Sequence, residues 1–328
     1  MRFDRFITLN LVQPIRRSLC HLRSINPRSP TPSGFIPILM YHSISNDSEV
    51  SVGPYYKTNT SPAVFRRHME FLRGEGYHTL SLEQALELQE HGLASFDGKD
   101  QASRPKPTEP SISPAFPSRC VVVTFDDGYR DFYTEAFPAL REHGFSATMF
   151  LPTSLIQNPR RSFKGKECMT WDEVRELDKA GMHFGSHTVT HPKLVELSWP
   201  EIRSEVSESK SQIEQQLGHP ATTFAYPFAF PQMDKQFVLN FTTELREAGY
   251  QCCATTEVGR LKAGDNPYRL KRLPVNSLDD PSLFRAKLDG SYDWLAAPQA
   301  WIKQLKRRAR PFRESRTLNT VEPRSNLN

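Results

Sequence analysis

The chain has 328 residues, which is enough for one large domain or two small ones. No stretch approaches the roughly 18 consecutive apolar residues of a membrane-spanning helix, so a transmembrane protein is excluded. The net charge of +5 is mild and gives no reason to expect a nucleic-acid partner. This charge is unevenly placed, because residues 1–30 carry +5 and residues 303–328 carry +6, whereas residues 31–302 carry −6. The composition therefore predicts an acidic body between two basic tails.

The cysteines and the first residues bear on the compartment. The five cysteines are odd in number and form no Cys-x-x-Cys pair, which argues against a disulfide framework and a cysteine zinc site. Arg2 and Arg5 precede a short apolar run broken by Asn10, and Arg16 and Arg17 stand where a signal peptide has small residues. We therefore expect no signal peptide, and a protein that is cytoplasmic or peripheral to a membrane.

The N-terminal part of the chain is expected to form a flexible arm followed by the start of a folded domain. Residues 1–33 hold four prolines and little periodicity, so we expect a flexible basic arm. The apolar run over residues 35–41 predicts a buried strand that ends at His42. Ser61 and Pro62 are a typical helix start, and apolar residues then recur at helical spacing.

Further elements alternate along the chain. A strand at 77–80 and a helix at 82–90 precede residues 94–118, whose prolines and serines predict a flexible insertion. The expected elements after this insertion are strands at 120–125, 147–151, 182–186, 222–226, 251–254 and 273–275, with helices at 133–143, 172–180 and 200–217. This alternation predicts a parallel sheet, and the number of units favours a (β/α) barrel over a doubly wound sheet. We expect a single domain over residues 34–285 and a basic C-terminal tail over residues 286–328.

Two acids follow the most strand-like run of the chain. Asp126 and Asp127 stand directly after it, and Gly128 permits a sharp turn that points both carboxylates outward. Adjacent carboxylates at the end of a buried strand repel each other and lose water, so such a pair needs a cation. The alternative is a strand-ending turn whose acids cap the next helix.

His187 and His191 also follow a predicted strand. Their spacing places both imidazoles on one side of a helical turn, which suits a single metal ion, and Pro192 ends the turn. Alone, the pair is more typical of two surface or core histidines. With one aspartate the set suits Zn²⁺ or a similar divalent ion together with an activated water.

Aromatic residues surround Pro227 after a further strand. Phe224, Tyr226 and Phe228 are typical of a core, but at the mouth of a barrel they would also suit the wall of a sugar site. A backbone N–H there would be able to bind an oxyanion.

Three motifs in this order, TFDDGY at 124–129, SHTVTHP at 186–192 and FAYPF at 224–228, resemble the polysaccharide deacetylases of the NodB-homology type, carbohydrate esterase family four. The likeness spans about residues 35–280 and includes Trp171. It implies a deformed (β/α)₇ barrel that hydrolyses N-acetyl groups of N-acetylhexosamine units in a polysaccharide or oligosaccharide.

The resemblance also implies roles for single residues. Asp126 would be the general base, and the backbone of Phe228 would help to bind the oxyanion. The metal ligands would be Asp127, His187 and His191, holding Zn²⁺ first, with Co²⁺, Ni²⁺ and Fe²⁺ as alternatives. Further residues expected in the substrate site are Tyr226, Pro227 and Trp171.

The chain departs from the family pattern at two places. Ala225 stands where many members have an arginine that holds the base, and no histidine follows His219 to serve as the general acid. The segment 39–42 looks like the acid motif moved to the front of the domain. This order resembles the circularly permuted branch of the family, which includes poly-β-1,6-N-acetylglucosamine deacetylases that act on exopolysaccharides. We therefore expect His42 as the acid and Arg272 as the residue that orients the base; the alternative for Arg272 is a solvated surface charge.

Two broader alternatives stay open at this point. The missing arginine is also compatible with a carbohydrate-binding protein that has lost hydrolysis. The basic segment after Trp301 and Ile302 is either a solvated tail or a surface that lies on an anionic membrane.

Overall fold

The computed structural model describes residues 2–22, 34–94 and 119–308. Seven parallel strands form a closed ring, in which each strand pairs with its neighbours in the order β2-β14-β12-β11-β10-β7-β6 and β6 returns to β2. The strands of the ring are β2 (Ile38–Tyr41), β6 (Cys120–Phe125), β7 (Thr148–Leu151), β10 (His183–Ser186), β11 (Thr223–Ala225), β12 (Cys252–Val258) and β14 (Leu270–Pro274). The short β5 (His78–Thr79) adds to the first residues of β6. The predicted (β/α)₇ barrel is thus confirmed.

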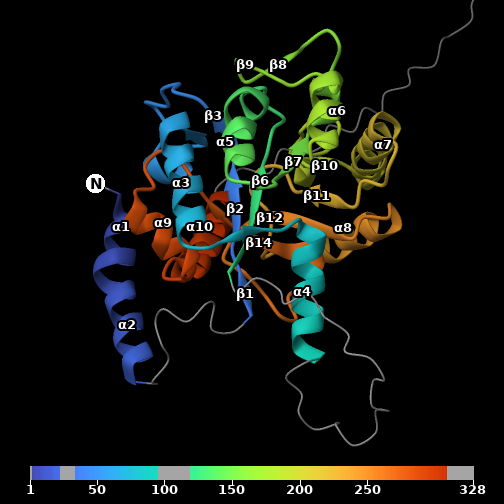
Figure 1. The fold of residues 1–328 in the computed structure, drawn as a ribbon. Helices are drawn as coiled ribbons and strands as arrows, with labels where there is room; N and C mark the ends of the chain where they lie inside the picture. The colour runs from blue at the N-terminus through green and yellow to red at the C-terminus, as the bar shows by residue number, and fades with distance from the viewer. Residues whose placement is uncertain (1, 23–33, 95–118, 309–328) are drawn as a thin grey trace, which may run out of the picture.

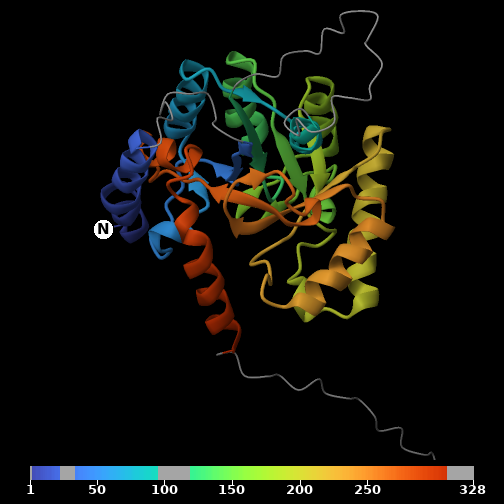
Figure 2. The same cartoon turned by 90° about the horizontal axis from the view of Figure 1, so that it is seen from below.

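Helices surround this ring (Figures 1 and 2). They are α3 (Pro62–Gly74), α4 (Leu82–Ala94), α5 (Phe137–Glu142), α6 (Trp171–Lys179), α7 (Trp199–Leu217), α8 (Lys235–Glu247), α9 (Pro281–Leu288) and α10 (Ala296–Arg308). Local signals explain several starts: Ser61 caps α3 through the N–H of Val64, and Thr170 and Glu173 form a capping box on α6. No helix of the described segments is long and apolar enough to cross a membrane.

Short pairings decorate the barrel. The antiparallel pairs are β1 (Phe35–Ile36) with β13 (Leu261–Lys262) and β8 (Ser162–Phe163) with β9 (Lys166–Glu167), and the parallel pair is β3 (Ser43–Ile44) with β4 (Asn59–Thr60). The β8–β9 hairpin stands at the top of Figure 1. Neither this hairpin nor α8 is anticipated by the sequence patterns above.

The alternation of strand side chains determines what the barrel interior holds. Ile38, Val122, Ala225 and Leu270 come from four strands and belong to one buried cluster, which fills the interior. Strand side chains of the opposite parity, such as Leu39, pack against the surrounding helices in a second cluster. A residue that lies two or four positions after an interior residue of the same strand therefore faces the C-terminal mouth of the barrel. Parallel (β/α) barrels carry their sites at this mouth.

The N-terminal segment corrects an expectation. Residues 3–22 are not a flexible arm but a continuous helical segment, made of α1 (Phe3–Ile7), a π-helical turn and α2 (Gln13–Leu22). The reason is long-range pairing: Arg2 reaches Asp279, and the indole of Trp294 donates to Thr8. Figures 1 and 2 show this segment beside α9. Residues 23–33 lie outside the described residues, as does the insertion predicted at 94–118 from residue 95 onward.

The expected C-terminal tail begins later than residue 286. Residues 281–308 include α9 and α10, and Gln299 of α10 accepts a hydrogen bond from the backbone N–H of Val258 on β12. Only residues 309–328 of the predicted tail lie outside the described part of the chain.

Candidate functional site

His42, Asp126 and Arg272 meet at the mouth of the barrel. His42 and Asp126 directly follow β2 and β6, whose last residues, Tyr41 and Phe125, are paired in register. Arg272 lies on β14, the other neighbour of β2. The closure of the ring therefore brings together residues that are far apart in the sequence.

A buried fork joins Arg272 to Asp126. Nη1 and Nη2 donate to the two carboxylate oxygens at 2.7 and 2.8 Å, and the arginine side chain is fully buried. The Nε group donates to the backbone carbonyl of Thr255 at 3.0 Å, which fixes the plane of the guanidinium. A bidentate, charge-assisted pair of this kind determines the orientation of the carboxylate. His42 lies near the same carboxylate, with Nε2 at 3.9 Å from Oδ2 of Asp126.

Asp127, His187 and His191 form a second buried group whose ligand atoms lie within 4.8 Å of one another. Oδ1 of Asp127 faces Nε2 of His191 at 3.1 Å and Nε2 of His187 at 3.7 Å. Nδ1 of His187 is 2.8 Å from the backbone carbonyl of Ala225 and donates to it, which leaves the lone pair of Nε2 directed at the group. Two imidazole nitrogens and one carboxylate oxygen are a donor set that fits Zn²⁺ or a related divalent ion.

The backbone around these ligands differs from the prediction. His187 and His191 lie on a loop, not on a helical turn, and this loop contains two left-handed residues, Thr188 (φ 71°) and His191 (φ 58°). Oγ1 of Thr188 accepts the N–H of His191 at 3.0 Å and stabilises the turn. Asp127 also has a positive φ of 74°. Such strained residues cluster at functional sites, where the fold holds them in place.

Charge determines the protonation states of this site. Burial by itself would raise the pKa of Asp126, but the charge and hydrogen bonds of Arg272 together with the nearby His187 and His42 lower it below its ordinary value. Burial lowers the pKa of His187 to about 4, against the opposing charge of Asp126. Burial also lowers the pKa of His42. An ionised Asp126 and a neutral His187 suit a base next to a metal site.

The FAYPF segment contributes less to the mouth than expected. Phe228 is 43% exposed and its ring lies 4.6 Å from that of His191, whereas Tyr226 is almost fully buried. Trp171 was expected in the substrate site, but its side chain is only 7% exposed and packs in the core between barrel and helices. The first position of α6 turns the indole inward, and a role of Trp171 in the substrate site stays a prediction.

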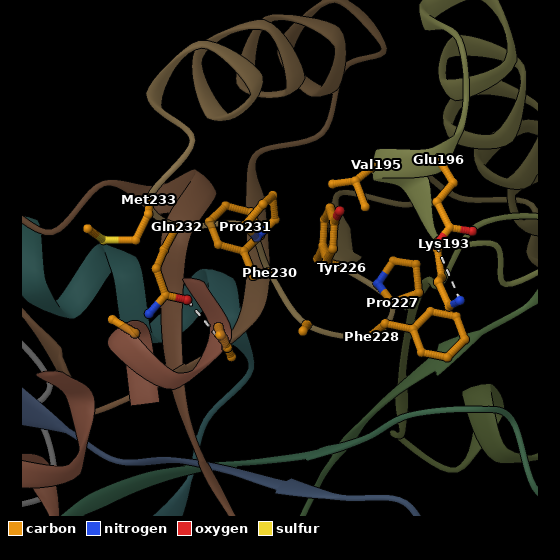
Figure 3. Close-up of a pocket in the computed structure, with 13 residues that line it drawn as sticks. Lys193, Val195, Glu196, Tyr226, Pro227, Phe228, Phe230, Pro231, Gln232 and Met233 are labelled. Atoms are coloured by element: carbon orange, nitrogen blue, oxygen red, sulfur yellow. Dashed lines mark hydrogen bonds and ion pairs between the residues drawn. The ribbon is translucent and has the colours of Figure 1, made fainter. Parts of the chain in front are cut away.

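A cavity of about 300 Å³ lies beside this segment (Figure 3). Pro227, Phe228 and Met233 form part of its largely apolar wall, and Lys193 and Lys303 contribute cations. The metal-ligand group does not line the cavity; the ring of Phe228 lies against both.

The β8–β9 hairpin is a part of the site that sequence reasoning missed. The ring of Phe163 lies 5.1 Å from that of His191, and Nζ of Lys164 lies 3.3 Å from Oδ2 of Asp127. The only local signal of the hairpin was the turn-forming pair Lys164-Gly165. The strands on either side have two residues each, which is too short to show strand periodicity.

Comparisons with known proteins show what the chain is similar to. The sequence profile described as polysaccharide deacetylase matches residues 113–252, which include Asp126, Asp127 and both histidines but neither His42 nor Arg272. A predicted polysaccharide deacetylase of Bacillus subtilis, YxkH, is 29% identical over 254 residues, which cover 77% of this chain and 76% of that protein.

More distant relatives are similar over smaller spans. Poly-β-1,6-N-acetyl-D-glucosamine N-deacetylases of Staphylococcus aureus are 24% identical over 49% of this chain, a match that spans only 56% of their own length.

Among solved structures, the deacetylase PplD of Streptococcus pyogenes, in complex with acetate, has a TM-score of 0.62 and 24% identity, over 78% of this chain and 99% of that one. IcaB of Ammonifex degensii has a TM-score of 0.59 and 20% identity, over 78% and 98%. These structures show the same fold. Beyond the fold, the chain is similar to the polysaccharide deacetylases, whose profile matches residues 113–252.

Proposed function

We propose that the protein is a metal-dependent hydrolase that removes N-acetyl groups from N-acetylhexosamine units of a polysaccharide or oligosaccharide. The observation that carries the proposal is the position of Asp126. Arg272 orients its carboxylate, His42 lies 3.9 Å away, and it adjoins Asp127 of the metal-ligand group in the chain. Base, acid and metal ligands thus surround one point at the mouth of the barrel.

The residues of the chain divide the work of amide hydrolysis. A divalent ion held by Asp127, His187 and His191 would polarise the acetyl carbonyl and activate a water. Asp126, ionised beside Arg272, accepts the proton of the attacking water. The backbone N–H of Phe228 is the proposed donor to the oxyanion. His42 protonates the departing sugar amine, which is a very poor leaving group as an anion.

The deciding experiment measures acetate release from N-acetylglucosamine oligomers by the purified protein loaded with Zn²⁺. Release that a chelator abolishes and added Zn²⁺ restores is the expected result. If no acetate is released although one metal ion binds per chain, the hydrolase proposal fails, and a carbohydrate-binding protein of the same fold becomes the better explanation.

We also propose that the C-terminal part of the protein contacts the surface of a membrane. Trp301 and Ile302 are exposed on α10, at 64% and 46%, and the sequence continues with three basic residues at 306–308. Apolar and basic residues together suit an anionic lipid surface. Co-sedimentation with phosphatidylserine vesicles that high salt abolishes is the expected result, and equal binding to neutral vesicles would count against it.

A further inference from the structure

The tip of the β8–β9 hairpin holds a lysine in an unfavourable backbone conformation. Lys164 and Gly165 connect the two strands and have φ of 50° and 80°. Two-residue hairpin loops with both φ positive favour Asn-Gly, and a long side chain at the first position is strained. Turn chemistry alone therefore does not explain why this position is a lysine.

The base of the hairpin is held firmly from two sides. Nζ of Lys166 donates to the hydroxyl groups of Ser43 and Ser45, each at 2.8 Å, and so joins the hairpin to the segment that follows His42. On the other side, the backbone N–H of Arg130 donates to the carbonyl of Glu167 at 2.9 Å. These contacts position the tip over the mouth of the barrel.

The side chain of Lys164 extends from this tip to the metal-ligand group. Its Nζ lies 3.3 Å from Oδ2 of Asp127 and 4.3 Å from the ring centroid of Phe163. The two oxygens of Asp127 thus have different neighbours, because Oδ1 faces the Nε2 atoms of His187 and His191. A cation on Oδ2 and a metal ion on Oδ1 are compatible with one carboxylate.

We propose that Lys164 is a positioning residue for Asp127, an inference that rests on the proposed metal-dependent function. Its ammonium group holds Oδ2 through a charge-assisted hydrogen bond, so that the carboxylate presents Oδ1 to the metal ion. Partners of this kind outside the ligand set orient the ligands and tune metal affinity. By holding Oδ2, Lys164 also keeps Asp127 from binding the ion through both oxygens.

The turn geometry supplies a variant that keeps the fold. Lys164→Asn creates the preferred sequence of such a turn, so the hairpin should be at least as stable, while the shorter side chain does not reach Asp127. Lys164→Arg keeps the cation. The matched control is Arg161→Ala, which removes an exposed positive charge before the same hairpin.

The first measurement is the Zn²⁺ affinity of each purified protein, by competition with a chromophoric chelator. Lys164→Asn is expected to weaken binding about tenfold or more. Lys164→Arg and Arg161→Ala should stay close to the wild type. Equal or tighter binding by Lys164→Asn overturns the proposal, because the ion pair would then only compete with the metal. A wild-type protein that binds no divalent ion would instead overturn the proposed function itself, so the two failures are distinguishable.

A second measurement reports on Oδ2 directly. In the Co²⁺-loaded protein, the visible absorption weakens when an additional ligand joins the ion. We expect weaker absorption for Lys164→Asn than for the wild type and for Lys164→Arg. Identical spectra would overturn the statement that Lys164 keeps Oδ2 away from the ion.

Discussion

Arg272 on β14 donates to both carboxylate oxygens of Asp126, at 2.7 and 2.8 Å, across β2, which lies between β14 and β6 in the closed ring. Burial raises the pKa of Asp126, but Arg272 and the nearby His187 and His42 together lower it below its ordinary value, so the carboxylate stays ionised. The family arginine expected in the third motif is absent at Ala225, and Arg272 supplies the same kind of charge from another strand. The ion pair with Arg272 therefore favours the ionised form of Asp126 and also fixes the orientation of its carboxylate.

Replacing Arg272 separates these two effects. Arg272→Met leaves the carboxylate buried without its partner and is expected to cost about 3–5 kcal/mol of unfolding free energy. Arg272→Lys keeps the charge but not the fork, and a carboxylate misplaced by about 1 Å would lower kcat about a hundredfold. Urea unfolding and steady-state acetate release measure the two quantities. A Lys variant with wild-type kcat would show that orientation by the fork does not matter.

Asp126 and His187 are expected to fail in different ways. Asp126→Asn removes the base and should lower kcat about 100- to 10,000-fold, while the metal content stays unchanged. His187→Ala removes a ligand and should lose the metal together with the activity. Metal analysis of both variants beside their kinetics makes the distinction. Full activity of Asp126→Asn would contradict the assignment of the base.

The role of His42 depends on the leaving group. An amine needs a proton on departure, whereas an aryl oxide is stable without one, so His42→Gln should slow amide hydrolysis much more than hydrolysis of an aryl acetate. The measurement is kcat on an N-acetylglucosamine oligomer and on 4-nitrophenyl acetate, with chelator-treated protein as the blank. An equal loss on both substrates would indicate a structural role for His42.

The sequence predicted this barrel well because each strand of the ring and several of its helices carry a local signal, such as Ser61-Pro62 at the start of α3. The motif residues Asp126, Asp127, His187 and His191 follow strands, so their meeting at one edge also follows from the alternation. The helical turn predicted for the histidines is wrong, since left-handed residues at 188 and 191 leave no periodic signal.

Other parts of the site depend on contacts between distant segments. The buried Arg2 pairs with Asp279, which lies far away in the sequence, and a basic arm with prolines gives no local hint of that pair. Lys164 acts from a hairpin of two-residue strands, which is shorter than any pattern can detect. Trp171 was expected in the site from the family resemblance, whereas the packing of α6 turns its indole toward the core.

His68 predicts a loss of stability in mild acid. Its Nε2 donates to the backbone carbonyl of Asp279 at 2.9 Å, and the hydroxyl of Tyr41 lies 3.1 Å from Nδ1, so the ring is held neutral. Burial lowers its pKa from 6.5 to about 4; the carbonyl and charge of Asp279 oppose this, and Lys287 and Arg67 add to it. The unfolded chain therefore binds the proton more readily, and stability is lost as the pH falls below 6.5.

The expected size of this loss is about 2 kcal/mol between pH 7 and pH 5, from the linkage of proton binding to unfolding. Urea unfolding at both pH values measures it, in the wild type and in His68→Gln. The variant should be less stable at pH 7 and should lack this part of the pH dependence. The same slope in both proteins would show that His68 does not contribute it.

The N-terminal helical segment is expected to contribute to the stability of the barrel through Arg2. Nη1 of Arg2 donates to Asp279 at 2.7 Å, and the side chain is 7% exposed. Because Lys287 also pairs with Asp279, Arg2→Ala should cost about 2–3 kcal/mol and not the full cost of an isolated buried charge. Arg5 is the matched control, since its ion pair with Asp280 is exposed and Arg5→Ala should cost less than about 1 kcal/mol. Urea unfolding at neutral pH compares the two variants, and equal losses would mean that the buried pair does not join this segment to the folded unit.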